Sequence, residues 1–173
     1  MLADISDLAP TEIPAACALF EQVFAAPITP AQWAWKYADG PRLGAVNLVA
    51  RDGNGQFLGH AGASVFAGVA GSAPLAMAQV CDVMVVPAAR SGVQVSSVYS
   101  RLMLALQAAL SQRFANPYAY GFAGIRPFKL GQRLGYYREL HACRPGYLAP
   151  QPAPPHAPAV VGAPRPLAKP RPA

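Results

Sequence analysis

The stretch that decides the fold reads Cys81-Asp82-Val83-Met84-Val85-Val86-Pro87-Ala88-Ala89-Arg90-Ser91-Gly92. Its apolar run without polar alternation is typical of a strand buried on both faces. Pro87 interrupts that run, because proline has no backbone N–H for a sheet. Leucines at four-residue spacing then predict a long helix over residues 98–114. We therefore expect a buried strand, a loop and a helix in that order.

The loop of this unit has the composition of an anion site. Free backbone N–H groups at a helix N-terminus carry about half a unit of positive charge, which suits a pyrophosphate. Gly92 would let the main chain approach phosphates closely, and Arg90 would add a charge-assisted hydrogen bond.

The elements on either side complete an α/β chain with a mixed sheet. The unit from Ala76 to Ala123 is strand, loop, helix and strand, which implies a parallel strand pair with a right-handed crossover. An Asp52-Gly53-Asn54-Gly55 turn predicts a hairpin before it. The predicted strands are 46–50, 57–69, 76–86, 118–123 and 136–143, and the predicted helices are 13–24, 31–37, 98–114 and 126–134.

Four segments together resemble the GNAT family of acyl-CoA-dependent N-acyltransferases over about residues 3–143. Residues 81–92 are similar to the family's signature strand and pyrophosphate loop. Lys129-Leu130-Gly131-Gln132-Arg133-Leu134-Gly135-Tyr136 resembles its short helix with a K-L-G-F/Y step. Gly59-His60-Ala61-Gly62 and Trp33-Ala34-Trp35-Lys36-Tyr37 are placed like its hairpin and second helix.

The resemblance implies a GNAT-like fold, with a central mixed sheet flanked by helices that splays open after the signature strand. Acetyl-CoA or another acyl-CoA would lie in the split as co-substrate, and an amine would attack the thioester directly. The implied cofactor-binding residues are Met84, Val85, Val86, Arg90, Ser91, Gly92, Val93, Gln94 and Val95.

Asp82 is the best candidate for the catalytic base. It is the only acid between Ala61 and Arg138, and it lies in the signature strand. A structural hydrogen bond at the end of a strand is the alternative. His60 and four tyrosines are further candidates for proton transfer, with core packing as their alternative role: Tyr118, Tyr120, Tyr136 and Tyr137.

Departures from the family pattern keep a second function open. Val93 and Val95 stand where small residues are expected, and Gly131 stands where the family often has a general-acid tyrosine. The alternative is a catalytically degenerate GNAT-fold binding module. A third possibility is an assembly subunit whose last strand comes from a partner, so a homodimer is possible.

Composition separates the chain into two parts. We predict an acyltransferase domain over 1–144 and a Pro-rich disordered tail over 145–173, because proline prevents helices and central strands.

The net charge of +6 comes without a basic face interleaved with aromatics, so we expect no nucleic-acid partner. The three cysteines show no metal spacing, so we expect no metal. With no export signal or membrane span, we expect a cytoplasmic enzyme acting on a small-molecule amine or a protein amine.

Overall fold

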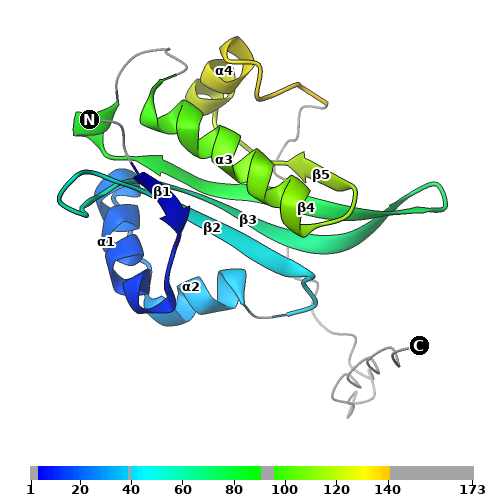
Figure 1. The fold of residues 1–173 in the computed structure, drawn as a ribbon, viewed down its shortest axis with the longest axis horizontal. Coiled ribbons are helices and arrows are strands. Elements are labelled where there is room, and N and C mark those ends of the chain that lie inside the picture. Colours follow the sequence, from blue (N-terminus) through cyan, green and yellow to red (C-terminus); the bar gives the residue numbers. More distant parts are fainter. Residues whose placement is uncertain (1–3, 39, 91–95, 141–173) are drawn as a thin grey trace, which may run out of the picture. The chain divides into compact units, whose positions relative to one another are not determined.

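The computed structural model describes residues 4–38, 40–90 and 96–140. The chain forms two compact units, Met1–Arg138 and Glu139–Ala173, and the helices and strands of the described residues all lie in the first. The five-stranded sheet has the order β1-β2-β3-β4-β5 (Figure 1). The first four strands are antiparallel, and β5 is parallel to β4. The strands are β1 (Asp4–Asp7), β2 (Gly44–Arg51), β3 (Phe57–Ala70), β4 (Ala73–Val85) and β5 (Pro117–Tyr120).

Helices cover both faces of this sheet (Figure 1). On one face lie α1 (Ile13–Phe24) and α2 (Pro30–Tyr37), and on the other lies α3 (Val98–Arg113). Short 3₁₀ turns, η1 (Pro10–Glu12) and η2 (Pro87–Ala89), precede α1 and follow β4. The helix α4 (Ile125–Arg133) follows β5. This is the predicted α/β architecture with a mixed sheet and flanking helices.

Two apolar cores hold the layers together. The α3 core packs the alternate residues of three strands against Leu102, Leu106 and Leu110 of the helix. The opposite core surrounds Trp33, which is almost fully buried, and packs α1 and α2 on the sheet. Because both faces are covered, the central strands need apolar residues at nearly every position.

A bulge in β4 exchanges the two faces of that strand. His60 pairs with Met84, and Gly62 pairs with Cys81, so two residues of β4 stand opposite one of β3. Before the bulge the even-numbered Ala76 and Ala78 face the α3 core, and after it the odd-numbered Val85 does. An extra residue in a strand shifts its side-chain alternation by one. The bulge residue is Asp82, whose φ is +50°.

The helix ends follow sequence signals. Thr29 caps α2: its Oγ1 accepts from the Gln32 N–H at 3.2 Å, and its own N–H donates to Gln32 Oε1 at 2.8 Å. Gly135 lies just past α4 with φ of +77°. The N–H groups of Gly135 and Tyr136 donate to the Gln132 and Gly131 carbonyls, which completes a Schellman motif.

In the described part of the chain, one strand was missed and one strand prediction was wrong. The missed strand is β1, which pairs with β2. The predicted strand over 136–143 is absent from residues 136–140, because the chain turns at Gly135 and Tyr136 bonds back to α4. Residues 141–143 lie outside the described ranges. Among the described helices, none is long and apolar enough to cross a bilayer.

Candidate functional site

The sheet opens beside β4 after a short parallel pairing. β4 and β5 pair only from Ala76 with Pro117 to Gln79 with Tyr120. Within the described residues, the later half of β4, from Val80 to Val85, pairs only with β3. An unpaired strand edge presents a row of backbone N–H and C=O groups that can bond an extended ligand.

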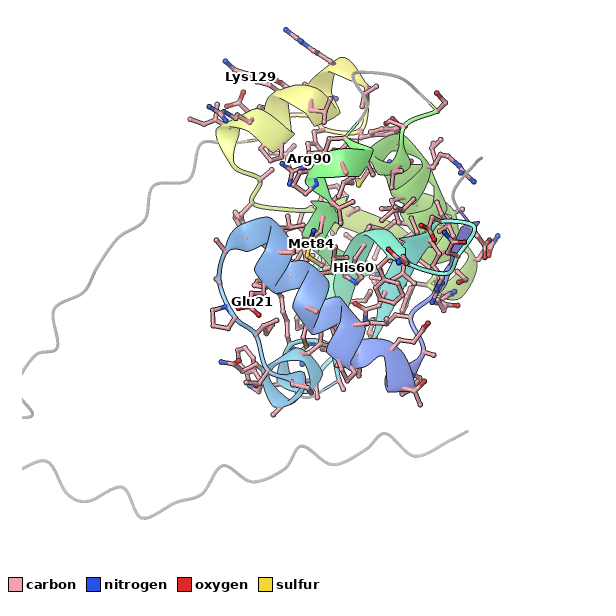
Figure 2. The ribbon with its side chains drawn as sticks, turned by 90° about the vertical axis from the view of Figure 1, so that its left-hand side faces the viewer. Glu21, His60, Met84, Arg90 and Lys129 are labelled. Carbon is pink, nitrogen blue, oxygen red and sulfur yellow. The ribbon has the colours of Figure 1, made fainter. Side chains whose placement is uncertain are left out.

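The far end of this open edge lies next to Arg90. The Val86 N–H donates to the Leu58 carbonyl of β3 at 2.9 Å, so the neighbouring Val85 directs its main chain to the open side. There the Val85 carbonyl accepts a hydrogen bond from Arg90 Nε at 2.9 Å. Figure 2 shows this end of the strand with Met84 and Arg90 labelled. The loop after β4 is thus tied to the open edge by a cation.

The N-terminus of α3 follows this loop. The helix begins at Val98 with Ser97 as its N-cap, whose hydroxyl accepts from the Ser100 N–H. A helix of this length carries partial positive charge at that end. The predicted phosphate contacts of Ser91, Gly92, Val93, Gln94 and Val95 lie outside the described residues.

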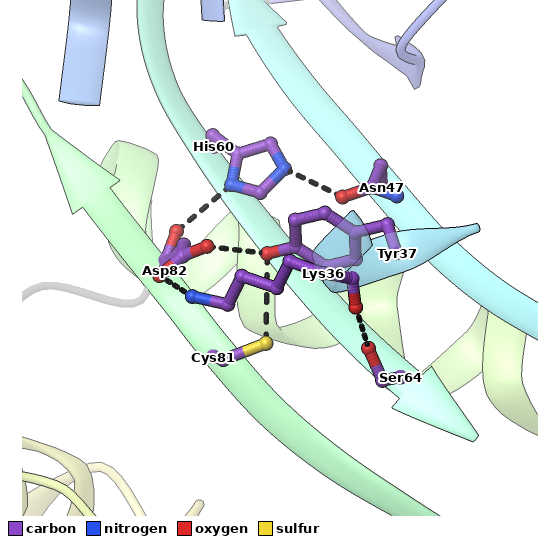
Figure 3. Close-up of polar contacts among 7 residues, drawn as sticks. All are labelled: Lys36, Tyr37, Asn47, His60, Ser64, Cys81 and Asp82. Carbon is purple, nitrogen blue, oxygen red and sulfur yellow. Dashed lines mark hydrogen bonds and ion pairs between the residues drawn. The ribbon is translucent and has the colours of Figure 1, made fainter. Parts of the chain in front are cut away.

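A polar cluster surrounds Asp82 in the middle of the open edge (Figure 3). Asp82 Oδ1 accepts from Lys36 Nζ at 2.6 Å, and Asp82 Oδ2 accepts from the Tyr37 hydroxyl at 2.7 Å. The Asp82 side chain is 8% exposed and the Lys36 side chain is 31% exposed. The carboxylate is therefore buried, whereas the Lys36 side chain is partly exposed and extends to it from the surface.

Local backbone geometry makes this cluster possible. The bulge turns both Cys81 and Asp82 toward α2, where both side chains contact the Tyr37 hydroxyl. A left-handed φ at a non-glycine residue costs energy, and aspartate tolerates it better than most residues. Opposite the bulge, Gly62 leaves room for Tyr37, since a Cβ there would lie 2.5 Å from the hydroxyl oxygen.

His60 supports the bulge from β3. Its ring is fully buried between Trp33 and Tyr37. His60 Nδ1 donates to the Asp82 main-chain carbonyl at 2.8 Å, and Nε2 lies 3.1 Å from Asn47 Oδ1. Burial lowers the pKa of His60 to about 4. His60 is therefore neutral at pH 7, and its one ring proton lies on Nδ1.

Two further ionisable groups of the cluster stay protonated. Burial, together with the nearby Cys81 and Asp82, raises the pKa of the Tyr37 hydroxyl well above its ordinary value. Burial also raises the pKa of the Cys81 thiol. Neither group is therefore a ready nucleophile at neutral pH, and Tyr37 serves as a hydrogen-bond donor to Asp82.

Other residues singled out in the sequence have structural surroundings. Met84 is buried in the core under α1 and α2, and Trp33 belongs to the same core. Trp35 is largely exposed. The Tyr136 hydroxyl donates to the Ser100 carbonyl. A Cβ at Gly131 would lie 2.2 Å from the Tyr137 ring, so that ring fills the space next to the position where the family often has a tyrosine.

Sequence reasoning missed the partners of Asp82. Lys36 and Tyr37 lie at the end of α2, more than forty residues before Asp82. The capping signal at Thr29 fixed where α2 begins, but nothing in the sequence indicated which face of the sheet its last turn would contact. A bulge in β4 was also needed to bring Asp82 to that face.

Comparisons with known proteins agree on one family. Residues 4–138 match the family model described as an acetyltransferase (GNAT) domain. No curated protein sequence matches the chain. Among solved structures, a Trypanosoma brucei acetyltransferase has a TM-score of 0.61 at 14% identity, covering 84% of this chain and 99% of that one.

Two further structures have the same fold and named substrates or ligands. The glucosamine-6-phosphate N-acetyltransferase of Arabidopsis thaliana has a TM-score of 0.61 at 10% identity, covering 85% of this chain and 99% of its own. The aminoglycoside N-acetyltransferase AAC(6′)-Iy in complex with CoA has a TM-score of 0.62 at 15% identity, covering 85% and 95%. With an open β4 edge, Arg90 beside its end and a matching family model, the chain belongs to the GNAT acetyltransferase family.

Proposed function

We propose that the chain is an acyl-CoA-dependent N-acyltransferase that transfers an acetyl or other acyl group from the CoA thioester to an amine. This proposal rests on the edge of β4 from Val80 to Val85, which does not pair with β5. The edge ends near Arg90 and the N-terminus of α3. An extended pantetheine arm and a pyrophosphate fit these two features in that order.

The chain's own residues supply binding and proton transfer. Val85 would bond the pantetheine arm through its main chain once Arg90 releases its carbonyl, and Arg90 would then be free to pair with phosphate. Met84 and Val86 direct their main-chain polar groups to β3, so they would shape the site from the β3 side. The predicted contribution of Ser91–Val95 belongs to the same proposal.

Asp82 is the proposed general base. The acyl-CoA supplies an activated carbonyl, and the attacking amine must lose a proton for the amide to form. Asp82 holds an amine nitrogen, that of Lys36, at 2.6 Å, which is the distance that proton transfer needs. Tyr37 and the His60–carbonyl bond hold the residue in position.

The acceptor is proposed from the chemistry of the fold's relatives. Structures with this fold include enzymes named for glucosamine-6-phosphate and for aminoglycosides, both of which are amines. We propose a small-molecule amine as the acceptor, with a protein amine as the alternative. A cytoplasmic location and the domain limits 1–144, with a Pro-rich tail over 145–173, remain predictions.

A binding module without catalysis is the second candidate. Gly131 stands where the family often has a tyrosine, and the Tyr137 ring excludes a larger side chain there. Asp82 is also already paired with Lys36. A module of this kind would bind acyl-CoA and leave amines unmodified.

Thermal unfolding with and without acetyl-CoA is the first test. A ligand at one hundred times its Kd stabilises a protein by about 2.7 kcal/mol, which raises Tm by roughly 5 to 10 °C for a domain of this size. We expect Arg90→Ala to reduce this rise. Arg113→Ala is the matched control, because Arg113 lies at the opposite end of α3 in an exposed ion pair with Asp7.

The second step separates an enzyme from a binding module. Release of free CoA is followed with a panel of amines, using Asp82→Asn as the comparison. We expect the variant to bind acetyl-CoA as the wild type does and to lose about 10²–10⁴-fold in rate. Binding without CoA release on any amine would favour the binding module, and no rise in Tm at millimolar acetyl-CoA would refute the proposal.

A further inference from the structure

Lys36 places a primary amine against the proposed base. Lys36 Nζ lies 2.6 Å from Asp82 Oδ1, and this ion pair joins α2 to the open half of β4 (Figure 3). An intermolecular acceptor would need to bring its nitrogen to the same carboxylate. The protein therefore already contains an amine where the proposed reaction requires one.

The position of this amine is set from both sides. The Ser64 hydroxyl donates to the Lys36 carbonyl at 3.1 Å and holds the last turn of α2 on β3. The Tyr37 hydroxyl occupies Asp82 Oδ2, which leaves Oδ1 for the ammonium group. A nitrogen fixed beside a base has a large kinetic advantage over one that must diffuse to it.

The lysine is also free to move a short distance. Its side chain is 31% exposed, while that of Asp82 is 8% exposed. Asp82 lies within the stretch Val80–Val85, the same strand edge that we propose to hold the thioester arm. Rotation of a flexible lysine side chain about the carboxylate would bring its nitrogen toward that edge.

We propose that Lys36 is a self-acylation site of this protein, an inference that rests on the proposed acyl-CoA reaction. Asp82 takes one proton from the Lys36 ammonium group. The Lys36 nitrogen then forms an amide bond with the acyl carbon as the carbon–sulfur bond breaks. The electron pair of that bond leaves on sulfur, the amide nitrogen loses a second proton to solvent or to the thiolate, and the products are CoA and acyl-Lys36.

Acylation would change the charge of the cluster. An amide carries no charge, so the ion pair with Asp82 is lost and the carboxylate keeps the Tyr37 hydroxyl as its described side-chain donor. The carboxylate would then be open to the amine of another molecule. Self-acylation would thus convert the base from a paired to an available state.

Peptide mass spectrometry of the full chain tests this directly. The wild-type protein is incubated with acetyl-CoA, and acetylation at Lys36 is compared with that at Lys129, an exposed lysine on α4. A parallel incubation with acetyl phosphate measures the intrinsic reactivity of the two amines. We expect acetyl-CoA to favour Lys36 over Lys129 at least about ten-fold more than acetyl phosphate does.

Two further readouts identify the reaction as intramolecular and base-assisted. The rate constant at Lys36 is expected to stay unchanged on ten-fold dilution of the protein at saturating acetyl-CoA. Asp82→Asn is expected to lower it at least about ten-fold. If that variant does not fold, Lys36→Arg keeps the positive charge and is expected to lose the acetyl group from the intact mass while keeping the rise in Tm with acetyl-CoA.

The results separate this inference from the proposed function. If acetyl-CoA raises Tm but Lys36 reacts no faster than Lys129, the self-acylation proposal is refuted and the cofactor site stands. If acetyl-CoA neither raises Tm nor acetylates Lys36 selectively, both proposals fail. Selective, dilution-independent acetylation that needs Asp82 supports both.

Discussion

Removing His60 should change how the stability of this protein depends on pH. His60 is fully buried, and burial lowers the pKa of its ring to about 4, from an ordinary value of 6.5. The substitution to test is His60→Gln, which keeps a polar side chain of similar size and cannot be protonated. The readout is the difference in slope between the two proteins, since the variant also loses packing against Trp33 and Tyr37.

The sign and magnitude follow from the two pKa values. Between pH 6.5 and about 4 the unfolded histidine binds a proton and the folded one does not, so the free energy of unfolding falls as pH is lowered through this window. At 1.36 kcal/mol per pKa unit, the full effect is roughly 3 kcal/mol. Above pH 6.5 both states are neutral, and His60 contributes no slope.

Urea unfolding at pH 7.5, 6.0, 5.5 and 5.0 measures this effect. Between pH 7.5 and 5.0, the free energy of unfolding of the wild type should fall by about 2 kcal/mol more than that of His60→Gln. A double variant, His141→Gln with His156→Gln, keeps His60 and tests whether the slope belongs to it. Parallel pH profiles for the wild type and His60→Gln would refute the assignment of a buried neutral histidine.

Two stability predictions concern local geometry. Thr29→Ala removes the acceptor for the Gln32 N–H and should cost about 1 kcal/mol in urea unfolding, and an unchanged midpoint would count against the cap. Gly131→Ala should cost about 1–3 kcal/mol because its Cβ would lie 2.2 Å from the Tyr137 ring. Gly124→Ala is its control, since a Cβ there would come no closer than 3.9 Å to any atom beyond the neighbouring residues. Equal effects of the two glycine changes would contradict the close packing at Gly131.

Local sequence signals determined most of the elements. The predicted helices over 13–24 and 98–114 match α1 and α3 to within a residue at each end, because apolar spacing and stop signals act within one segment. For the same reason, proline and glycine signals placed the ends of α2 and α4 to within a residue of the predicted 31–37 and 126–134. The four-residue strand β1 carries too little periodicity to be seen, and it forms only because β2 offers an edge.

The sequence by itself also determined the family, since the signature strand, the loop and the segment Lys129–Tyr136 are contiguous motifs. Only the tertiary structure decided the surroundings of Asp82. A bulge in β4, a glycine opposite it and the last turn of α2 bring Lys36 and Tyr37 to its carboxylate. These residues are distant in the sequence, and their contact depends on strand register and on which face of the sheet a helix covers. Such contacts arise from packing between segments, so no single segment of the sequence predicts them.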